Sequence, residues 1–166
     1  MIIVGADPGI SGALAAVQFG RRGASYVLDV LDMPTLPTKS KRRTVDAQAI
    51  ADWLEGFGPD LTADDWHCVI EDVHSMPGNG HVGAFTFGRS KGVLEGVCAG
   101  LGLPVTMVRP MTWKSALDLS SDKADSLEMA RSLWPSHAEV FARKKDDGRA
   151  EACLLAAYGA LYAPVG

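Results

Sequence analysis

The sequence has few of the features that would place it in a membrane or in an oxidising compartment. No apolar run approaches the length needed to span a bilayer, and the first residues lack the basic-then-apolar order of a signal peptide. The cysteines Cys68, Cys98 and Cys153 stand far apart among apolar neighbours, which is typical of buried, reduced thiols. We therefore expect a cytoplasmic protein with no membrane partner.

The chain also has no excess of positive charge and no histidine pair with the spacing of zinc ligands. Its formal net charge is -4, so bulk attraction does not account for any binding of nucleic acid, and such a partner must be held by local basic patches. A length of 166 residues with 47% hydrophobic content suits one core, and no repeat or linker divides it. We expect a single domain over residues 1–166.

Alternating apolar runs and amphipathic stretches predict an α/β fold. Three strands joined as a meander should be followed by strand–helix–strand units and a closing helix, giving a mixed sheet covered by helices. The expected strands cover residues 1–6, 12–19, 25–33, 67–73 and 104–108. The expected helices cover residues 47–57 and 82–101, a short helix from Pro110, a helix capped by Ser121 that runs to Trp134, and residues 146–162.

Two segments fit this pattern less well. The prolines Pro34 and Pro37 and the basic run at 39–43 predict a loop whose cations can contact phosphates. The helix at 82–101 contains glycines every four or five residues, which weaken a helix or allow another backbone to approach closely. Residues 83–90 copy the glycine spacing of a phosphate-binding P-loop, but Arg89 replaces the lysine, so coincidence explains the match better.

Acidic residues stand at the ends of predicted elements. Asp7 follows the first strand, Glu71 closes the fourth, and Asp147 and Glu151 lie one turn apart on the last helix. If the two strands are neighbours, their carboxylates meet at one edge of the sheet. Carboxylates beside an apolar core require positive charge, and oxygen ligands without cysteine or histidine favour Mg²⁺ or Mn²⁺. Two such ions about 4 Å apart can hydrolyse a phosphodiester.

The ordered set of motifs resembles RuvC-type Holliday junction resolvases, particularly their phage-associated relatives. The resemblance rests on Ile3-Val4-Gly5-Ala6-Asp7-Pro8-Gly9 with Gly12, on Val69-Ile70-Glu71, and on Asp147-Gly148-Arg149-Ala150-Glu151-Ala152. It implies a ribonuclease H-like fold, with a five-stranded mixed sheet of three antiparallel strands and then two parallel ones, flanked by helices. It also implies a homodimeric crossover junction endodeoxyribonuclease of DNA recombination and repair, which resolves four-way junctions by paired nicks.

The resemblance assigns roles to single residues. Asp7, Glu71, Asp147 and Glu151 take the four positions that bind two Mg²⁺ ions, for which Mn²⁺ can substitute. The neighbouring Asp146 leaves open which of the two aspartates is the ligand. Cellular members usually place two aspartates three apart in the last helix, whereas Asp147 and Glu151 are four apart, with Gly148 between them.

Basic residues flank the site in the resembled family, and similar residues occur here. Lys114 and Lys123 match those positions and can stabilise charge that develops on the phosphate or orient the attacking water. Arg89 and Lys91 can contact DNA phosphates, and His74 follows Glu71 in a loop where family members touch bases near the junction centre.

Three alternatives stay open at this stage. The first is a nuclease with less selectivity among branched DNAs. The second is a phosphate-binding domain like those of actin-like ATPases and sugar kinases, which also have an aspartate and glycines after an apolar strand, but which use two such domains to enclose a nucleotide. The third is an inactive DNA-binding module, which would gain nothing from acids that face phosphates.

Overall fold

A computed structural model describes residues 1–20, 23–39, 42–58, 66–73 and 80–162. Its centre is a five-stranded sheet in the order β3-β2-β1-β6-β7, and a second, two-stranded sheet is formed by β4 and β5. The strands are β1 Ile2–Ala6, β2 Ala13–Phe19, β3 Ser25–Asp32, β4 Thr35–Pro37, β5 Arg43–Val45, β6 Trp66–Glu71 and β7 Val105–Val108.

The pairing of the strands confirms the predicted mixed sheet. β1 pairs antiparallel with β2, and β2 with β3, whereas β1 with β6 and β6 with β7 are parallel. All of β6 and most of β1 are buried, as expected for central strands covered on both faces. The parallel pairing brings the carboxyl ends of β1, β6 and β7 to one edge.

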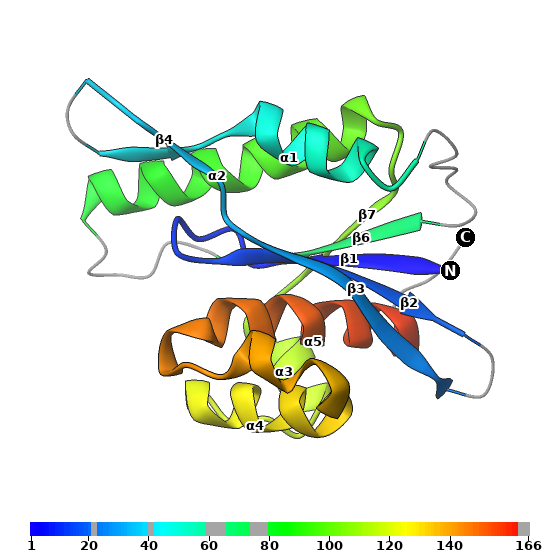
Figure 1. Ribbon diagram of the computed structural model, residues 1–166. Helices are drawn as coiled ribbons and strands as arrows, with labels where there is room; N and C mark the ends of the chain where they lie inside the picture. The colour runs from blue at the N-terminus through cyan, green and yellow to red at the C-terminus, as the bar shows by residue number, and fades with distance from the viewer. Residues whose placement is uncertain (21–22, 40–41, 59–65, 74–79, 163–166) are drawn as a thin grey trace.

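Helices cover the sheet on both faces (Figure 1). On one side lie α1 Ala47–Glu55 and α2 His81–Gly100, which pack on a core that includes Val4, Ile50, Leu54 and Leu94. On the other side lie α3 Pro110–Ala116, α4 Lys123–Leu133 and α5 Asp147–Tyr162, over a second core. Two short 3₁₀ segments, η2 Pro135–Phe141 and η3 Lys144–Asp146, join α4 to α5.

The final helix α5 lies directly on β1 because both are lined by small residues. A Cβ atom at Gly5 would stand 1.9 Å from the carbonyl oxygen of Ala152 and 2.7 Å from the backbone nitrogen of Ala156. At Gly159 it would stand 2.5 Å from a methyl group of Val69 on β6. Such distances are far below van der Waals contact, so glycine is required here for the helix to approach the sheet.

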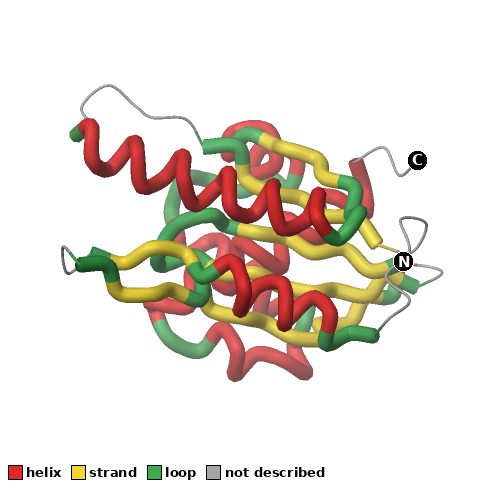
Figure 2. Tube along the Cα trace, turned by 90° about the horizontal axis from the view of Figure 1, so that it is seen from above, coloured by secondary structure: helices red, strands yellow, loops and turns green. Residues whose placement is uncertain are grey.

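The segment expected to be a loop at 34–43 contains the β4–β5 hairpin. Thr35 pairs with Val45 and Pro37 with Arg43. Pro34 directly precedes β4 and Pro37 is its last residue, and at such positions the missing N–H of a proline costs little. The prediction of irregular structure was wrong because the prolines mark the edge of a hairpin. Figure 2 shows this hairpin and α1 following one another alongside α2.

Two finer expectations about helices also need correction. The side chain of Asp122, rather than that of Ser121, accepts the capping hydrogen bond at the start of α4, from the N–H of Ala124. The glycines of α2 form a regular helix and do not pack against another element of the described chain: apart from the helix's own backbone and the chain neighbours, no described atom lies within 4 Å of a Cβ placed at Gly83, Gly88, Gly92, Gly96 or Gly100. None of the described helices is long and apolar enough to cross a membrane.

Candidate active site

The topology brings Asp7 and Glu71 to one edge of the sheet. Asp7 directly follows β1, Glu71 is the last residue of β6, and the two strands pair in parallel with Ala6 opposite Ile70. The condition under which the two carboxylates meet, that their strands are neighbours, is thus fulfilled. Gly12 of the following turn keeps the Asp7 side chain close, because a Cβ there would stand 2.7 Å from its Cγ atom.

The start of α5 adds the other two carboxylates to this edge. Asp147 is the first residue of α5, and Glu151 stands one turn later with only 8% of its surface exposed. Gly148 faces the turn after β1, where a Cβ would lie 3.0 Å from the carbonyl oxygen of Ser11 and 3.1 Å from Cα of Gly12. A side chain at 148 would therefore crowd that turn, which disfavours an acid three residues before Glu151.

Burial and mutual repulsion perturb the acids at this edge. Burial raises the pKa of Asp7 to about 6, opposed by a hydrogen bond from the Gly9 N–H at 3.1 Å and reinforced by the negative charges of Glu151 and Asp147. Burial raises the pKa of Glu71 to about 7, and the charges of Asp7 and Glu151 contribute to the increase. The four carboxylates therefore share one electrostatic environment.

Trp113 holds Glu71 in place, a contact that sequence reasoning missed. The indole nitrogen of this fully buried residue donates to Oε1 of Glu71 at 2.9 Å, and this hydrogen bond opposes the rise in the pKa of Glu71. A tryptophan in the short helix that follows β7 was a usable signal, because a buried indole N–H requires an acceptor.

The edge of the sheet that carries Asp7, Glu71, Asp147 and Glu151 is called the acidic edge here. Two lysines reach it, as the motif positions predict. Nζ of Lys114 on α3 lies 2.6 Å from Oε1 of Glu151, and both side chains are largely buried. Lys123, the first residue of α4, is paired with Asp147 but remains mostly exposed, and this partner raises the pKa of Lys123. Each lysine thus neutralises a different carboxylate of α5.

Asp146 and Asp147 have different surroundings, although they are adjacent in sequence. Asp146 accepts from the guanidinium group of Arg143 at 2.7 Å and from the Arg143 N–H at 2.7 Å, and these interactions lower its pKa. The charge of Asp147, in contrast, acts on Asp7. The geometry favours Asp147 over Asp146 as a member of the acidic edge.

The donor chemistry at this edge fits a divalent cation. Carboxylate oxygens are the ligands that Mg²⁺ and Mn²⁺ prefer. As the side chains stand, the described residues include no group of three or more His, Cys, Asp and Glu side chains that could hold a metal ion. Lys114 and Lys123 instead pair with two of the four carboxylates, which leaves the carboxyl groups of Asp7 and Glu71 without an ion pair in the described part of the chain.

The remaining predicted DNA contacts lie on or near α2. Arg89 is exposed on this helix, and Lys91 is paired with Asp72, which directly follows Glu71. His74 lies outside the described residues. Residues 83–90, which imitate a P-loop, lie entirely within α2, so this segment does not have the loop conformation that wraps a phosphate.

Comparison with known proteins gives one curated relative and a set of solved structures. No family model matches the chain. It is similar to "Holliday junction resolvase MOC1, chloroplastic" of Chlamydomonas reinhardtii, with 36% identity over 91 residues, which are 54% of this chain and 10% of that protein. The match therefore spans only about a tenth of the length of that relative.

The solved structures confirm the fold along nearly the whole chain. RuvC of T. thermophilus in complex with a Holliday junction substrate matches with a TM-score of 0.70 and 20% identity, covering 97% of this chain and 96% of that one. A second structure of Thermus thermophilus RuvC matches with a TM-score of 0.62 and 23% identity over the same shares. The resemblance to RuvC-type resolvases is thus confirmed at the level of the fold, and so is the predicted five-stranded mixed sheet.

Proposed function

We propose that this protein is a Mg²⁺-dependent endonuclease that resolves four-way DNA junctions by paired nicks and acts as a homodimer. The observation that supports this most directly is the convergence of Asp7, Glu71, Asp147 and Glu151, from three separate parts of the chain, at one edge of a RuvC-like sheet. The similarity to a named Holliday junction resolvase points to the same substrate class.

The four carboxylates would hold the cations, and the other residues would position the reactants. When bound, two divalent cations would supply an activated water and stabilise the leaving oxygen of the phosphodiester. Trp113 keeps Glu71 oriented through its 2.9 Å hydrogen bond. Asp7 is oriented by the Gly9 N–H at 3.1 Å. Both acids are therefore held by hydrogen bonds, which lowers the cost of organising the site when the side chains rearrange around a cation.

Lys114 would exchange partners when substrate binds. In the absence of DNA its ammonium group neutralises Glu151 at 2.6 Å. With Glu151 holding a cation, the ammonium group of Lys114 would be free to donate to a non-bridging phosphate oxygen as negative charge develops there. Lys123, whose side chain is 70% exposed, would make the same exchange at Asp147 but in a more screened environment.

A panel of labelled substrates tests the proposal. Purified protein is incubated with a synthetic four-way junction, a replication fork and linear duplex, each with and without Mg²⁺. We expect symmetrical paired nicks in the junction, only with the metal. Equal cutting of all three substrates would reduce the function to general nuclease, and specific binding of a nucleotide without DNA cleavage would favour the kinase-like alternative.

A further inference from the structure

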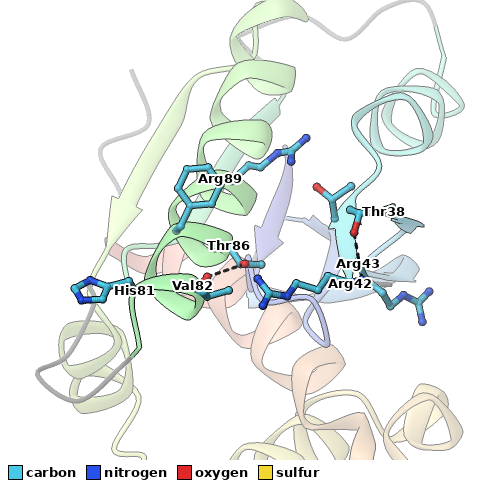
Figure 3. A pocket seen from close by; sticks show the side chains of 9 residues that line it. Thr38, Arg42, Arg43, His81, Val82, Thr86 and Arg89 are labelled. Atoms are coloured by element: carbon cyan, nitrogen blue, oxygen red, sulfur yellow. Dashed lines mark hydrogen bonds between the residues drawn. The ribbon is translucent and has the colours of Figure 1, made fainter. Parts of the chain in front are cut away.

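A basic groove lies on the α2 side of the sheet, apart from the acidic edge. The β4–β5 hairpin and the first three turns of α2 enclose a cavity of about 590 Å³, and β5 is in contact with α2. Figure 3 shows Arg42 and Arg43 on the hairpin side of this cavity and Arg89 on the α2 side. The full lining, here called the hairpin groove, is Thr38, Arg42, Arg43, Thr44, His81, Val82, Phe85, Thr86 and Arg89.

The arginines of the hairpin groove are not neutralised by the protein. In the described part of the chain, none of Arg42, Arg43 and Arg89 is in an ion pair, and no aspartate or glutamate lines the groove. By contrast, Arg143 and Arg149 pair with Asp146 and Asp32. In a chain of net charge -4, three unpaired guanidinium groups around one concave surface form a local site for an anion.

The backbone of the hairpin holds two of these arginines in place. The N–H of Thr38 donates to the carbonyl oxygen of Arg42 at 2.7 Å, and the N–H of Arg42 donates to Oγ1 of Thr38 at 3.2 Å. Arg43 is the first residue of β5 and pairs with Pro37. Guanidinium groups carried on a hairpin and a helix suit phosphate oxygens, which they can bind in a bidentate manner.

The hairpin groove leads towards the acidic edge. Arg43 also lines a second cavity of about 430 Å³, which is bounded by Gly12 of the turn next to Asp7 and by Lys145 and Asp146, just before α5. One arginine therefore belongs to both cavities. A polyanion that follows the cations from Arg89 through Arg43 to Lys145 would arrive beside the start of α5, where Asp147 lies.

We propose that the hairpin groove binds the sugar–phosphate backbone of one DNA arm, with Arg42, Arg43 and Arg89 as phosphate contacts that do not take part in the chemical step. The inference rests on the proposed function for the nature of the polyanion. It adds the β4–β5 hairpin as a binding element, and it predicts that affinity and catalysis depend on different faces of the sheet.

The salt dependence of binding is the test. Binding of a labelled four-way junction is followed by fluorescence anisotropy in EDTA between about 50 and 300 mM salt, for the wild type and for the variant R42A/R43A/R89A. Each lost duplex phosphate contact lowers the slope of log K against log salt by about 0.9, so the triple variant should lose between about 2 and 3, with an affinity reduced on the order of a hundredfold at about 0.1 M salt.

Matched measurements separate the loss of phosphate contacts in the groove from a general loss of charge or of folding. K39A removes a cation of the same hairpin that does not line the groove, and should change the slope by less than half as much as R43A. R89A is a substitution on an exposed helix position, so it tests the proposal even if the triple variant does not fold. In the arginine variants, the junction concentration that gives half of the maximal single-turnover rate should rise in step with the loss of affinity.

Several outcomes would overturn the inference. An unchanged slope in R89A and in the triple variant, or an equal loss in K39A, would show that the groove does not hold the backbone. A change from dimer to monomer in the arginine variants, measured by light scattering, would show that a second copy of the chain occupies the groove. If the arginines govern DNA binding but the wild type cuts no substrate, the proposed function fails while the groove inference holds. If the wild type cuts the junction normally but its binding does not depend on the arginines, the proposed function holds and the groove inference fails.

Discussion

The two faces of the sheet differ in how closely their helices pack and in whether their charged side chains are paired. On the α5 face, glycine and alanine bring the helix into backbone contact with β1, and the carboxylates at the edge are paired with lysines or raised in pKa. On the α2 face, the helix glycines meet no described atom within 4 Å, and the groove arginines have no counterion there. A site that performs chemistry must be rigid and desolvated, whereas a surface that receives a polyanion must keep its charge available.

Neutralising either strand-end acid should produce the largest effect. We expect D7N and E71Q each to lower the cleavage rate on the order of a thousandfold or more, because each substitution would remove a proposed metal ligand while keeping the fold. Junction affinity in EDTA should be unchanged or higher, since less negative charge faces the phosphates. Single-turnover gel assays and anisotropy measure the two quantities.

A variant that nicks the junction at the normal rate would contradict the assignment of that acid. D146N is the matched control, because the carboxylate of Asp146 is paired with Arg143 and does not belong to the acidic edge. We expect this control to retain most of its cleavage rate, with any loss explained by a lower melting temperature.

Packing on the α5 face should be intolerant of even one methyl group. G5A places a Cβ 1.9 Å from the carbonyl oxygen of Ala152, so α5 must shift, and we expect the free energy of unfolding to fall by about 3 kcal/mol or more. Urea unfolding followed by circular dichroism measures this. Because the shift also moves Asp147 and Glu151 away from Asp7, cleavage should fall in the fraction that remains folded.

The two lysines should differ because their surroundings differ. Lys114 has a side chain only 17% exposed, whereas that of Lys123 is 70% exposed. We expect K114A to lower the single-turnover rate about a hundredfold, with a much smaller loss of affinity, and K123A to lower it only severalfold. Equal losses of rate and affinity in K114A would make Lys114 a simple phosphate contact.

The raised pKa values give the metal-free protein an unusual dependence of stability on pH. Asp7 at about 6 and Glu71 at about 7 ionise less readily in the folded state than in the unfolded state, where their values are 3.8 and 4.5. Their charged forms therefore destabilise the fold above pH 7, and this penalty is relieved progressively as pH falls from about 7 towards 4. Each group contributes about 2 to 3 kcal/mol.

Melting temperatures in EDTA between pH 8 and 5 measure this effect. We expect the wild type to gain stability on acidification more than D7N/E71Q does, and Mg²⁺ to abolish most of the difference because it binds the folded state. The same pH profile for both proteins would show that the two acids are not destabilised by burial.

Sequence reasoning identified those features that depend on local pattern and on long-range chain order. The continuous apolar run before Asp7 and the closing position of Glu71 on its strand were enough to predict the shared sheet edge. The β4–β5 hairpin was missed because two three-residue strands bordered by prolines carry almost no periodicity. Trp113 and the Gly148 contact were missed because each depends on which distant backbone lies opposite, which only the folded chain reveals.

The smallest expected effect concerns the uncovered glycines of α2. In G92A/G96A, two alanines replace glycines at helix positions where no described atom lies within 4 Å of the new Cβ, so we expect a gain of about 1 kcal/mol per site in the free energy of unfolding. The sign of this effect is opposite to that of G5A, although the chemical change is the same.

If the proposed homodimer instead places a second copy on this face, the added methyl groups would weaken the dimer, and light scattering would show monomers at concentrations where the wild type is dimeric. A stabilised variant that stays dimeric would place the dimer contact elsewhere and leave this side of α2 open beside the hairpin groove.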